Sequence, residues 1–388
     1  MTKKIIFNQP SLIGKELEYI SDAITNHKKI SGDGFYTAKS RDFLKNYLGA
    51  HDVLLTHSCT AALEMSAILL DLKAGDELIM PSYTFVSTAN AFVLRGAVPV
   101  FVDIKLDNLN IDENLIEAAI TNKTKAIVVV HYGGVACEMD KIMAIAQKHN
   151  LFVVEDAAQA LGSKYKGKHL GTIGHFGCLS FHETKNIISG EGGALVINDK
   201  NYLDRAEIIR EKGTNRSKFF QGQVDKYTWV DIGSSFLPSD IIAAYLYSQL
   251  ENIEKINKQR IKIWQFYNQL FSKYAAQAQI KTLQISDDCQ FNAHLFYILF
   301  KDHQTRNQFI EFLKQNNVMA IFHYVPLHSS PAGLKFGKTP FAMKVTDLVA
   351  QTLVRMPLFY DLTDEQLNQI AQKVKQFFQQ FFTQKGSL

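Results

Sequence analysis

The chain has 388 residues, of which 46% are hydrophobic and 21% are charged. This length suits two domains, and the apolar content is ample for a sizeable core, which excludes a disordered chain. Lysine and arginine exceed aspartate and glutamate by 42 − 38 = 4. So mild a balance gives no reason to expect nucleic acid as a partner, because that partner usually requires a clustered basic face.

The four cysteines are scattered and form no CxxC pair, which indicates a reducing compartment rather than a disulfide framework. The N-terminus lacks an apolar run of signal-peptide length, and no run approaches the ~20 residues that a membrane span needs. We therefore expect a soluble, cytoplasmic protein without a membrane partner.

Short apolar runs alternate with helical patterns over the first two-thirds of the chain. Several runs are apolar on consecutive residues, as in strands that are covered on both faces. The predicted helices are residues 60–70, 86–93, 113–120 and 138–149. The predicted strands are residues 53–56, 77–80, 98–104, 125–130, 151–155, 178–181 and 194–198. This order predicts an α/β fold with a mostly parallel, doubly wound sheet and a ligand site at the carboxyl ends of its strands.

The pattern changes after about Gly233. One long helix is predicted over 239–274, with Ser239 and Asp240 as plausible caps. It is followed by strands at 294–300 and 318–324 and by helices at 306–316 and 363–382. We expect a large domain with an N-terminal arm over 1–238 and a smaller α+β domain over 239–388.

The strand predicted at 151–155 ends in two acids, Glu155 and Asp156. Neighbouring side chains of a strand point to opposite faces, so one carboxylate can enter a site at the strand end. Such a carboxylate costs several kcal/mol unless a cation meets it. Taken alone, the pair is better explained as a helix cap or a salt bridge.

Lys185 lies just past another predicted strand and before the glycine-rich segment 190–193. A lysine in that place can be desolvated, which lowers the pKa of its amine and makes it nucleophilic toward an aldehyde. The simpler interpretation is a solvated surface charge, as for most lysines.

Ser58, Cys59 and Thr60 stand between a predicted strand and a helix of small and apolar residues. Backbone N–H groups at that helix N-terminus, together with the hydroxyl groups, can bind a phosphate. Taken alone, this segment is better explained as an ordinary N-cap. The three segments together supply a phosphate site, a carboxylate for a ring nitrogen and an amine for an aldehyde, which is the combination that pyridoxal 5'-phosphate (PLP) requires.

Other candidate ligands give weaker signals. A GxxGxxG spacing is formed by Gly171, Gly174 and Gly177. No phosphate-binding strand-turn-helix surrounds these glycines, so we interpret them as loop residues. His175, Cys178 and His182 match no standard zinc pattern, and we predict no metal site.

From about residue 7 to about residue 382, the chain resembles the DegT/StrS family of sugar aminotransferases, which are fold-type I PLP enzymes of the aspartate aminotransferase type. The matching segments are residues 58–63, 81–85, 155–159, 180–185, 190–193 and 323–328. The resemblance implies that Lys185 is the catalytic residue that forms the Schiff base with the cofactor. It implies that Asp156 pairs with the pyridine nitrogen, that Gln159 lies beside the ring and that Phe85 stacks on it. It assigns the phosphate to Cys59, Thr60 and Ser180.

The family forms homodimers with active sites at the interface, which implies that the segment 216–235 reaches the neighbouring subunit's site. The family usually carries a Gly-x-Asn-x-Arg motif there, whereas this chain has Ser235 in place of the asparagine and Leu237 in place of the arginine. Ser235 is therefore a cofactor contact only by position. Candidate substrate contacts are Tyr83, Arg216, Lys226, His323, Tyr324 and His328. Arg216 and Lys226 are included because a diphosphate needs cations, whereas His323 and His328 could equally be core histidines.

The segments 80–96, 130–139, 213–217 and 225–229 resemble a subgroup that acts on a TDP-linked keto sugar. That resemblance implies transfer of the amino group of L-glutamate to C-4 of TDP-4-keto-6-deoxy-D-glucose, in surface polysaccharide synthesis. Amination at C-3 and the C-4 gluco epimer remain open. A PLP sugar dehydratase is disfavoured because such relatives carry histidine where this chain has Lys185. A PLP-binding regulator without turnover is disfavoured because the chain has no visible DNA-binding segment.

Overall fold

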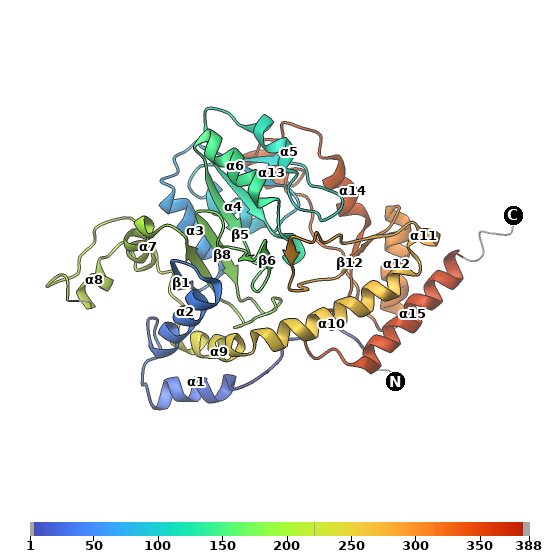
Figure 1. Ribbon diagram of the computed structural model, residues 1–388, viewed down its shortest axis with the longest axis horizontal. Coiled ribbons are helices and arrows are strands. Elements are labelled where there is room, and N and C mark those ends of the chain that lie inside the picture. Colours follow the sequence, from blue (N-terminus) through green and yellow to red (C-terminus); the bar gives the residue numbers. More distant parts are fainter. Residues whose placement is uncertain (1–3, 221, 383–388) are drawn as a thin grey trace.

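The computed structural model describes residues 4–220 and 222–382, and a seven-stranded sheet lies at its centre (Figure 1). Its order is β1-β9-β8-β5-β4-β2-β3. Strand β9 is antiparallel to both of its neighbours, and all the other neighbouring pairs are parallel. The strands are β1 (Asp52–Thr56), β2 (Glu77–Pro81), β3 (Val98–Val102), β4 (Thr124–Val130), β5 (Phe152–Asp156), β8 (Phe176–Ser180) and β9 (Gly193–Ile197). The prediction of a mostly parallel sheet is confirmed.

Helices cover both faces of this sheet, and alternate residues of a strand enter different cores. In β4, Ile127 and Val129 pack in one core, whereas Ala126 and Val128 pack in the other. Because both faces of the sheet are buried, the strand sequences are continuous apolar runs. The helices of the first half are α1 (Glu16–Thr25), α2 (Phe35–Leu48), α3 (Cys59–Leu69), α4 (Val86–Val93), α5 (Glu113–Ile116), α6 (Met139–His149), α7 (Leu203–Arg210) and α8 (Arg216–Phe220). Short 3₁₀ turns lie at η1 (Glu117–Ala119), η2 (Tyr132–Gly134) and η3 (Lys200–Tyr202).

The second half is built on a small antiparallel sheet of order β10-β12-β13. Its strands are β10 (Lys281–Thr282), β12 (Tyr297–Leu299) and β13 (Leu353–Arg355). A further small sheet joins β11 (Cys289–Gln290) to β6 (Lys164–Tyr165) and β7 (Lys168–His169). The helices are α9 (Asp240–Glu251), α10 (Ile253–Ser272), α11 (Ala275–Ala278), α12 (His303–Gln315), α13 (Pro331–Phe336), α14 (Lys344–Thr352) and α15 (Asp364–Phe382). The division of the chain between residues 238 and 239 remains a proposal.

Two local predictions for the second half are wrong. The single helix expected over 239–274 is divided at Asn252, whose φ of −108° and ψ of 12° end α9 before α10 begins. The strand expected over 318–324 is reduced to isolated bridges, from Val318 to Ile5 and from Ile321 to Arg355. The predicted cap is present, since the Ser239 hydroxyl accepts a hydrogen bond from the Ile242 N–H.

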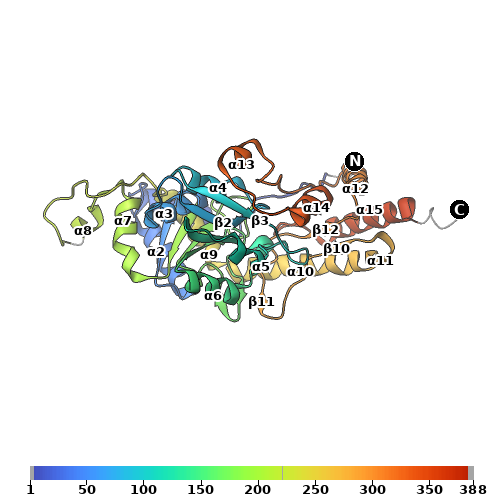
Figure 2. The same cartoon turned by 90° about the horizontal axis from the view of Figure 1, so that it is seen from above.

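Helix α10 runs from the region of the large sheet toward α12 and α15, as both views show (Figures 1 and 2). The segment around α8 extends away from the rest of the molecule in the same views. It carries several exposed apolar side chains, namely Phe219, Phe220, Tyr227, Trp229 and Val230. Among the residues described, no helix combines the length and the apolar character needed to cross a membrane.

Candidate active site

A cavity of about 670 Å³ lies where the carboxyl ends of β5 and β8 face residues of the second half. Asp156 closes β5, Ser180 closes β8, and Lys185 follows in the loop after β8. Tyr324 and Arg355 line the opposite part of the same cavity. The site therefore occupies the sheet edge at which a doubly wound fold is expected to bind its ligand.

Asp156 is buried, with 5% of its surface exposed. One carboxylate oxygen accepts a 2.6 Å hydrogen bond from the Thr88 hydroxyl, and the other accepts one from the Ala158 N–H at 3.2 Å. Burial raises the pKa of Asp156, while the Thr88 hydrogen bond and the charge of Lys185 oppose that effect. A cationic group bound in the cavity would stabilise the ionised carboxylate, and a protonated pyridine nitrogen is such a group.

Glu155, the neighbouring acid, points to the other side of the strand and has a different environment. It is fully buried and lies 2.9 Å from the ring nitrogen Nε2 of His131. Its oxygens also accept hydrogen bonds from the backbone N–H groups of Gly171, Ile173 and Gly174, at 2.6 to 2.7 Å. Two of the three glycines noted above, Gly171 and Gly174, therefore help to hold Glu155, and of the two acids only Asp156 lines the cavity.

Lys185 is held in a hairpin that joins the neighbouring strands β8 and β9. Ser180 pairs with Gly193 at its base, and backbone hydrogen bonds join Phe181 to Gly192 and Glu183 to Gly190. Burial lowers the pKa of the Lys185 amine. Among the carboxylates that the structure describes, none lies within 4.0 Å of this amine. Lys185 can therefore supply a neutral, nucleophilic amine inside the cavity.

The start of helix α3 forms a third side of the site. Ser58 is its N-cap and accepts a hydrogen bond from the Ala61 N–H, while the Thr60 hydroxyl donates to Ser87 at 2.8 Å. A Cβ atom on Gly193 would lie 2.4 Å from the Cys59 nitrogen, so only glycine lets β9 approach the helix start this closely. The first N–H groups of a helix have no acceptor within it, and Ser58, Cys59, Thr60 and Ser180 all line the cavity. These donors fit a phosphate.

Two further predicted residues lie between the sheet and the second half. The Gln159 side-chain oxygen Oε1 accepts a hydrogen bond from the Gly133 N–H at 2.7 Å, and its side-chain amide nitrogen donates to the Tyr324 hydroxyl at 2.9 Å. Phe85 precedes α4 and lines the cavity, and 56% of its surface is exposed. A flat aromatic ligand can therefore lie beside Gln159 and stack on Phe85.

His323 and Tyr324 also line the cavity, and their rings stack with centroids 3.6 Å apart. The Tyr132 hydroxyl lies 2.6 Å from the His323 ring nitrogen Nδ1. Burial lowers the pKa of His323 well below its usual value, so the ring is neutral near pH 7 and can accept the Tyr132 proton.

Five residues that were predicted to contact the cofactor or the substrate do not line this cavity. Tyr83 is buried behind it against the rings of Tyr132 and Tyr324. His328 contacts the Ser82 hydroxyl at 2.8 Å and lies 3.4 Å from Asp347. The other three belong to the segment around α8 and the stretch after it. These are Arg216, paired with Glu211 at 3.5 Å, the exposed Lys226, and the exposed Ser235, bridged to Glu211.

The residues of the lining that sequence reasoning missed include two arginines and a histidine, namely Arg260, Arg355 and His294. Arg260 lies on α10, His294 precedes β12 and Arg355 ends β13. None of them occupies the end of a long apolar run, which was the signal that found Asp156 and Lys185. The only sequence signal for the two arginines is a charged residue next to apolar neighbours.

The fold and the donors in this cavity define a fold-type I, PLP-dependent aminotransferase. Residues 11–375 match the model of the DegT/DnrJ/EryC1/StrS aminotransferase family, and the chain belongs to that family. It is 32% identical to the spore coat polysaccharide biosynthesis protein SpsC of Bacillus subtilis, covering 94% of this chain and 95% of that one. It is 31% identical to GDP-perosamine synthase of Escherichia coli O157:H7, covering 97% and 99%. The PLP form of the putative sugar aminotransferase Spr1654 of Streptococcus pneumoniae superposes with a TM-score of 0.88, at 26% identity over 97% and 99% of the chains.

Proposed function

We propose that this aminotransferase moves the amino group of L-glutamate to C-4 of TDP-4-keto-6-deoxy-D-glucose, which gives TDP-4-amino-4,6-dideoxy-D-galactose. The observation that supports this most is the meeting of Lys185, Asp156 and the start of α3 around one cavity. Resemblance of the segments 80–96, 130–139, 213–217 and 225–229 to the transaminases that make this sugar supports the choice of substrate.

The residues of this chain have distinct tasks in such a reaction. When bound, PLP supplies an aldehyde for the amino group and a ring that withdraws electrons from the substrate carbon. Asp156 would hold the ring nitrogen in its protonated form, and the Thr88 hydroxyl orients Asp156 and favours its ionised form. Lys185 binds the cofactor and moves the proton at the substrate carbon, a form of general acid–base catalysis worth ~10²–10⁴ in rate. Cys59, Thr60 and Ser180 would hold the phosphate, and Gln159 and Phe85, which line the same cavity, would lie against the ring.

We also propose that the enzyme works in the cytoplasm as a homodimer with the active sites at the interface. The apolar side chains around α8 are exposed in the single chain, as a surface that packs on a second copy would be. In such a dimer Ser235 would approach the partner's cofactor, and Arg216 and Lys226 would approach the diphosphate of the nucleotide. Tyr83, His323, Tyr324 and His328 remain proposed substrate residues, and of these His323 and Tyr324 line the cavity.

The alternatives differ in substrate or in reaction. Amination at C-3 or formation of the C-4 gluco epimer would use the same residues, with the sugar turned over in the cavity. Another nucleotide is a further alternative, because the name of one relative specifies a GDP sugar. A dehydratase and a non-catalytic regulator are less favoured, because Lys185 is present and lines the cavity.

The visible absorption band of the PLP-loaded enzyme tests the proposal. We expect L-glutamate to bleach the band and TDP-4-keto-6-deoxy-D-glucose to restore it. The proton couplings of the product would then give the position and the configuration of the new amine. A bleached band that only a GDP-linked or a 3-keto sugar restores would contradict the proposed substrate. Absence of any visible band after addition of PLP would contradict the roles of Lys185 and Asp156.

A further inference from the structure

His294 lines the large cavity and is held there by three hydrogen bonds. It precedes β12 and is 8% exposed. Its backbone N–H donates to the Asn292 side-chain oxygen at 3.1 Å, and its carbonyl accepts from the Arg260 guanidinium at 2.6 Å. Its ring nitrogen Nδ1 lies 3.1 Å from the side-chain oxygen of Asn186, the residue that follows Lys185. The imidazole ring is therefore fixed beside the loop that carries the reactive amine.

The hydrogen bonds of Asn186 determine which ring nitrogen of His294 carries the proton. The side-chain nitrogen of Asn186 donates to the backbone carbonyl of Asn292 at 2.8 Å and to the side-chain oxygen of Asn257 at 3.0 Å. Because a backbone carbonyl can only accept, the amide nitrogen must face Asn292, and the amide oxygen must face His294. This oxygen also only accepts, so Nδ1 of His294 carries the proton and donates it.

The second ring nitrogen of His294, Nε2, is left as a hydrogen-bond acceptor. Burial and the charges of Lys185, Arg260 and Arg355 lower the pKa of His294 well below its usual value, so the ring is neutral near pH 7. A neutral imidazole that is protonated at Nδ1 has a free electron pair at Nε2. Within the described part of the chain Nε2 has no partner, yet it keeps accessible surface. It is therefore open to the cavity that His294 lines.

An acceptor in this place discriminates between the groups that the two substrates bring. The carboxylates of L-glutamate and the phosphates of a sugar nucleotide are themselves acceptors at neutral pH, so they cannot pair with Nε2. The hydroxyl groups of the sugar can donate. In a 4-keto-6-deoxy sugar, C-5 carries a methyl group, so the C-3 hydroxyl is the only hydroxyl next to the reacting carbon, where Lys185 moves the proton.

We propose that Nε2 of His294 accepts a hydrogen bond from the C-3 hydroxyl of the keto sugar and so makes the enzyme selective for 4-keto sugars that carry this hydroxyl. This rests on the proposed function, which it extends by naming a residue that recognises the sugar. The bond from His294 to the residue after Lys185 supports the choice of C-3, because it places the ring near the site of proton transfer.

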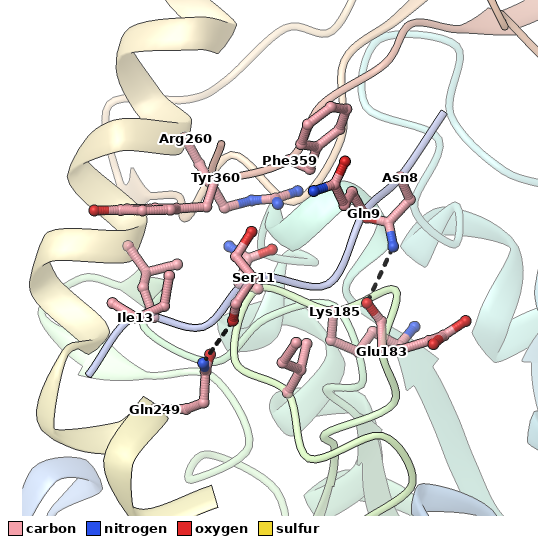
Figure 3. Close-up of a pocket in the computed structure, with 13 residues that line it drawn as sticks. Asn8, Gln9, Ser11, Ile13, Glu183, Lys185, Gln249, Arg260, Phe359 and Tyr360 are labelled. Atoms are coloured by element: carbon pink, nitrogen blue, oxygen red, sulfur yellow. Dashed lines mark hydrogen bonds between the residues drawn. The ribbon is translucent and has the colours of Figure 1, made fainter. Parts of the chain in front are cut away.

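Two amines compete with the hydroxyl as donors to Nε2, namely the ammonium group of L-glutamate and the amine of Lys185. Lys185 acts on His294 through its charge and makes no hydrogen bond to it in the structure. Figure 3 shows Arg260 extending from α10 into a small pocket that Lys185 also lines. An ammonium group at Nε2 would add a further positive charge to this region, whereas a hydroxyl group would not.

The test begins with substrates that differ by one hydroxyl. L-Glutamate first loads the enzyme with its amino group, and recovery of the visible band then gives kcat/KM for TDP-4-keto-6-deoxy-D-glucose and for its 3-deoxy and 2-deoxy analogues. We expect the 3-deoxy analogue to react about 3- to 10-fold less efficiently, the value of one net hydrogen bond, and the 2-deoxy analogue to lose less. Equal losses for the two analogues would overturn the assignment to C-3.

Substitution of His294 then connects this loss to the histidine. His294→Leu should lower kcat/KM for the full sugar by the same factor and leave that for the 3-deoxy analogue unchanged. His294→Gln should restore part of the loss, because its amide oxygen can replace the acceptor at Nε2. The exposed His303→Leu is the matched control. If the leucine variant does not fold, the analogue series in the parent and in His294→Gln decides the question.

The two half-reactions separate the three possible donors. We expect the rate at which L-glutamate bleaches the band to be unaltered in His294→Leu. A loss confined to that step would assign Nε2 to the ammonium group, and equal losses in both steps would assign it to Lys185; either result would overturn the proposal. A parent enzyme that accepts the sugar but does not distinguish the 3-deoxy analogue would reject this inference alone. Failure of the parent to react with the sugar at all would reject the proposed function, and the role of His294 with it.

Discussion

The Thr88 hydroxyl donates a 2.6 Å hydrogen bond to the carboxylate of Asp156 and lies 2.8 Å from the Thr84 hydroxyl. Thr88 is fully buried on α4, whereas Asp156 ends β5. A helix that packs beside the large sheet therefore orients the carboxylate that the cofactor ring would contact, and its hydroxyl favours the ionised form.

Thr88→Val should remove this hydrogen bond while keeping the shape of the side chain. Because the bond lowers the pKa of Asp156, its loss should weaken PLP binding and turnover by about tenfold, the value of one hydrogen bond of ~1.5 kcal/mol. The measurement is PLP affinity followed by visible absorption. Thr84→Val serves as a control and should have the smaller effect, since it removes only the hydrogen bond between the Thr84 and Thr88 hydroxyls. Equal effects of the two substitutions would contradict the special role of Thr88.

Lys185→Ala should abolish turnover and leave the fold intact. The amine both binds the cofactor and moves the proton, so we expect a loss of at least ~10²–10⁴ in the rate of 2-oxoglutarate formation. Circular dichroism and the unfolding temperature of the variant should match those of the parent. An active alanine variant would refute the assignment of Lys185.

Substitution of the two neighbouring acids should affect different properties, namely activity for Asp156 and stability for Glu155. Asp156→Asn should reduce activity strongly without destabilising the cofactor-free protein, because burial already disfavours the charged form. Glu155→Ala should cost about 3–5 kcal/mol of unfolding free energy, since it leaves His131 and three backbone N–H groups without their acceptor. Urea unfolding of both variants provides the comparison, and a stable Glu155→Ala protein would contradict it.

Acid should destabilise the protein in part through His169. Burial lowers the pKa of this histidine to about 4, from an ordinary value near 6.5. Between these values the unfolded chain binds the proton and the folded chain does not, so the free energy of unfolding falls as the pH falls from 6.5 to 4, by up to about 3 kcal/mol. We expect His169→Leu to lose less stability than the parent between pH 7 and pH 4.5 in urea unfolding. The exposed His303→Gln is the control, and an unchanged pH slope in His169→Leu would disprove the effect.

The sequence predicts the large sheet well because its strands are long and buried on both faces. Each of the seven predicted strands is present, and Asp156 and Lys185 were found because they follow two of those strands. The second half is less predictable, because its strands span only two or three residues and carry no clear periodicity. Arg260 and Arg355 were missed there, and the break at Asn252 has no proline or glycine to announce it.

The hairpin that carries Lys185 has a consequence for which changes of length the chain can tolerate. Its base is fixed by the pairing of Ser180 with Gly193, and backbone hydrogen bonds from Phe181 to Gly192 and from Glu183 to Gly190 hold the connection, so a residue inserted or deleted between 181 and 192 would break these bonds and displace the amine. The segment around α8 is joined at its base by bridges from Glu211 to Ser235 and from Thr214 to Trp229, but the part beyond them projects from the body and carries no residue of the cavity lining. Differences in length that separate enzymes of this type should therefore accumulate in the projecting segment, while the spacing from Ser180 to Gly193 stays constant.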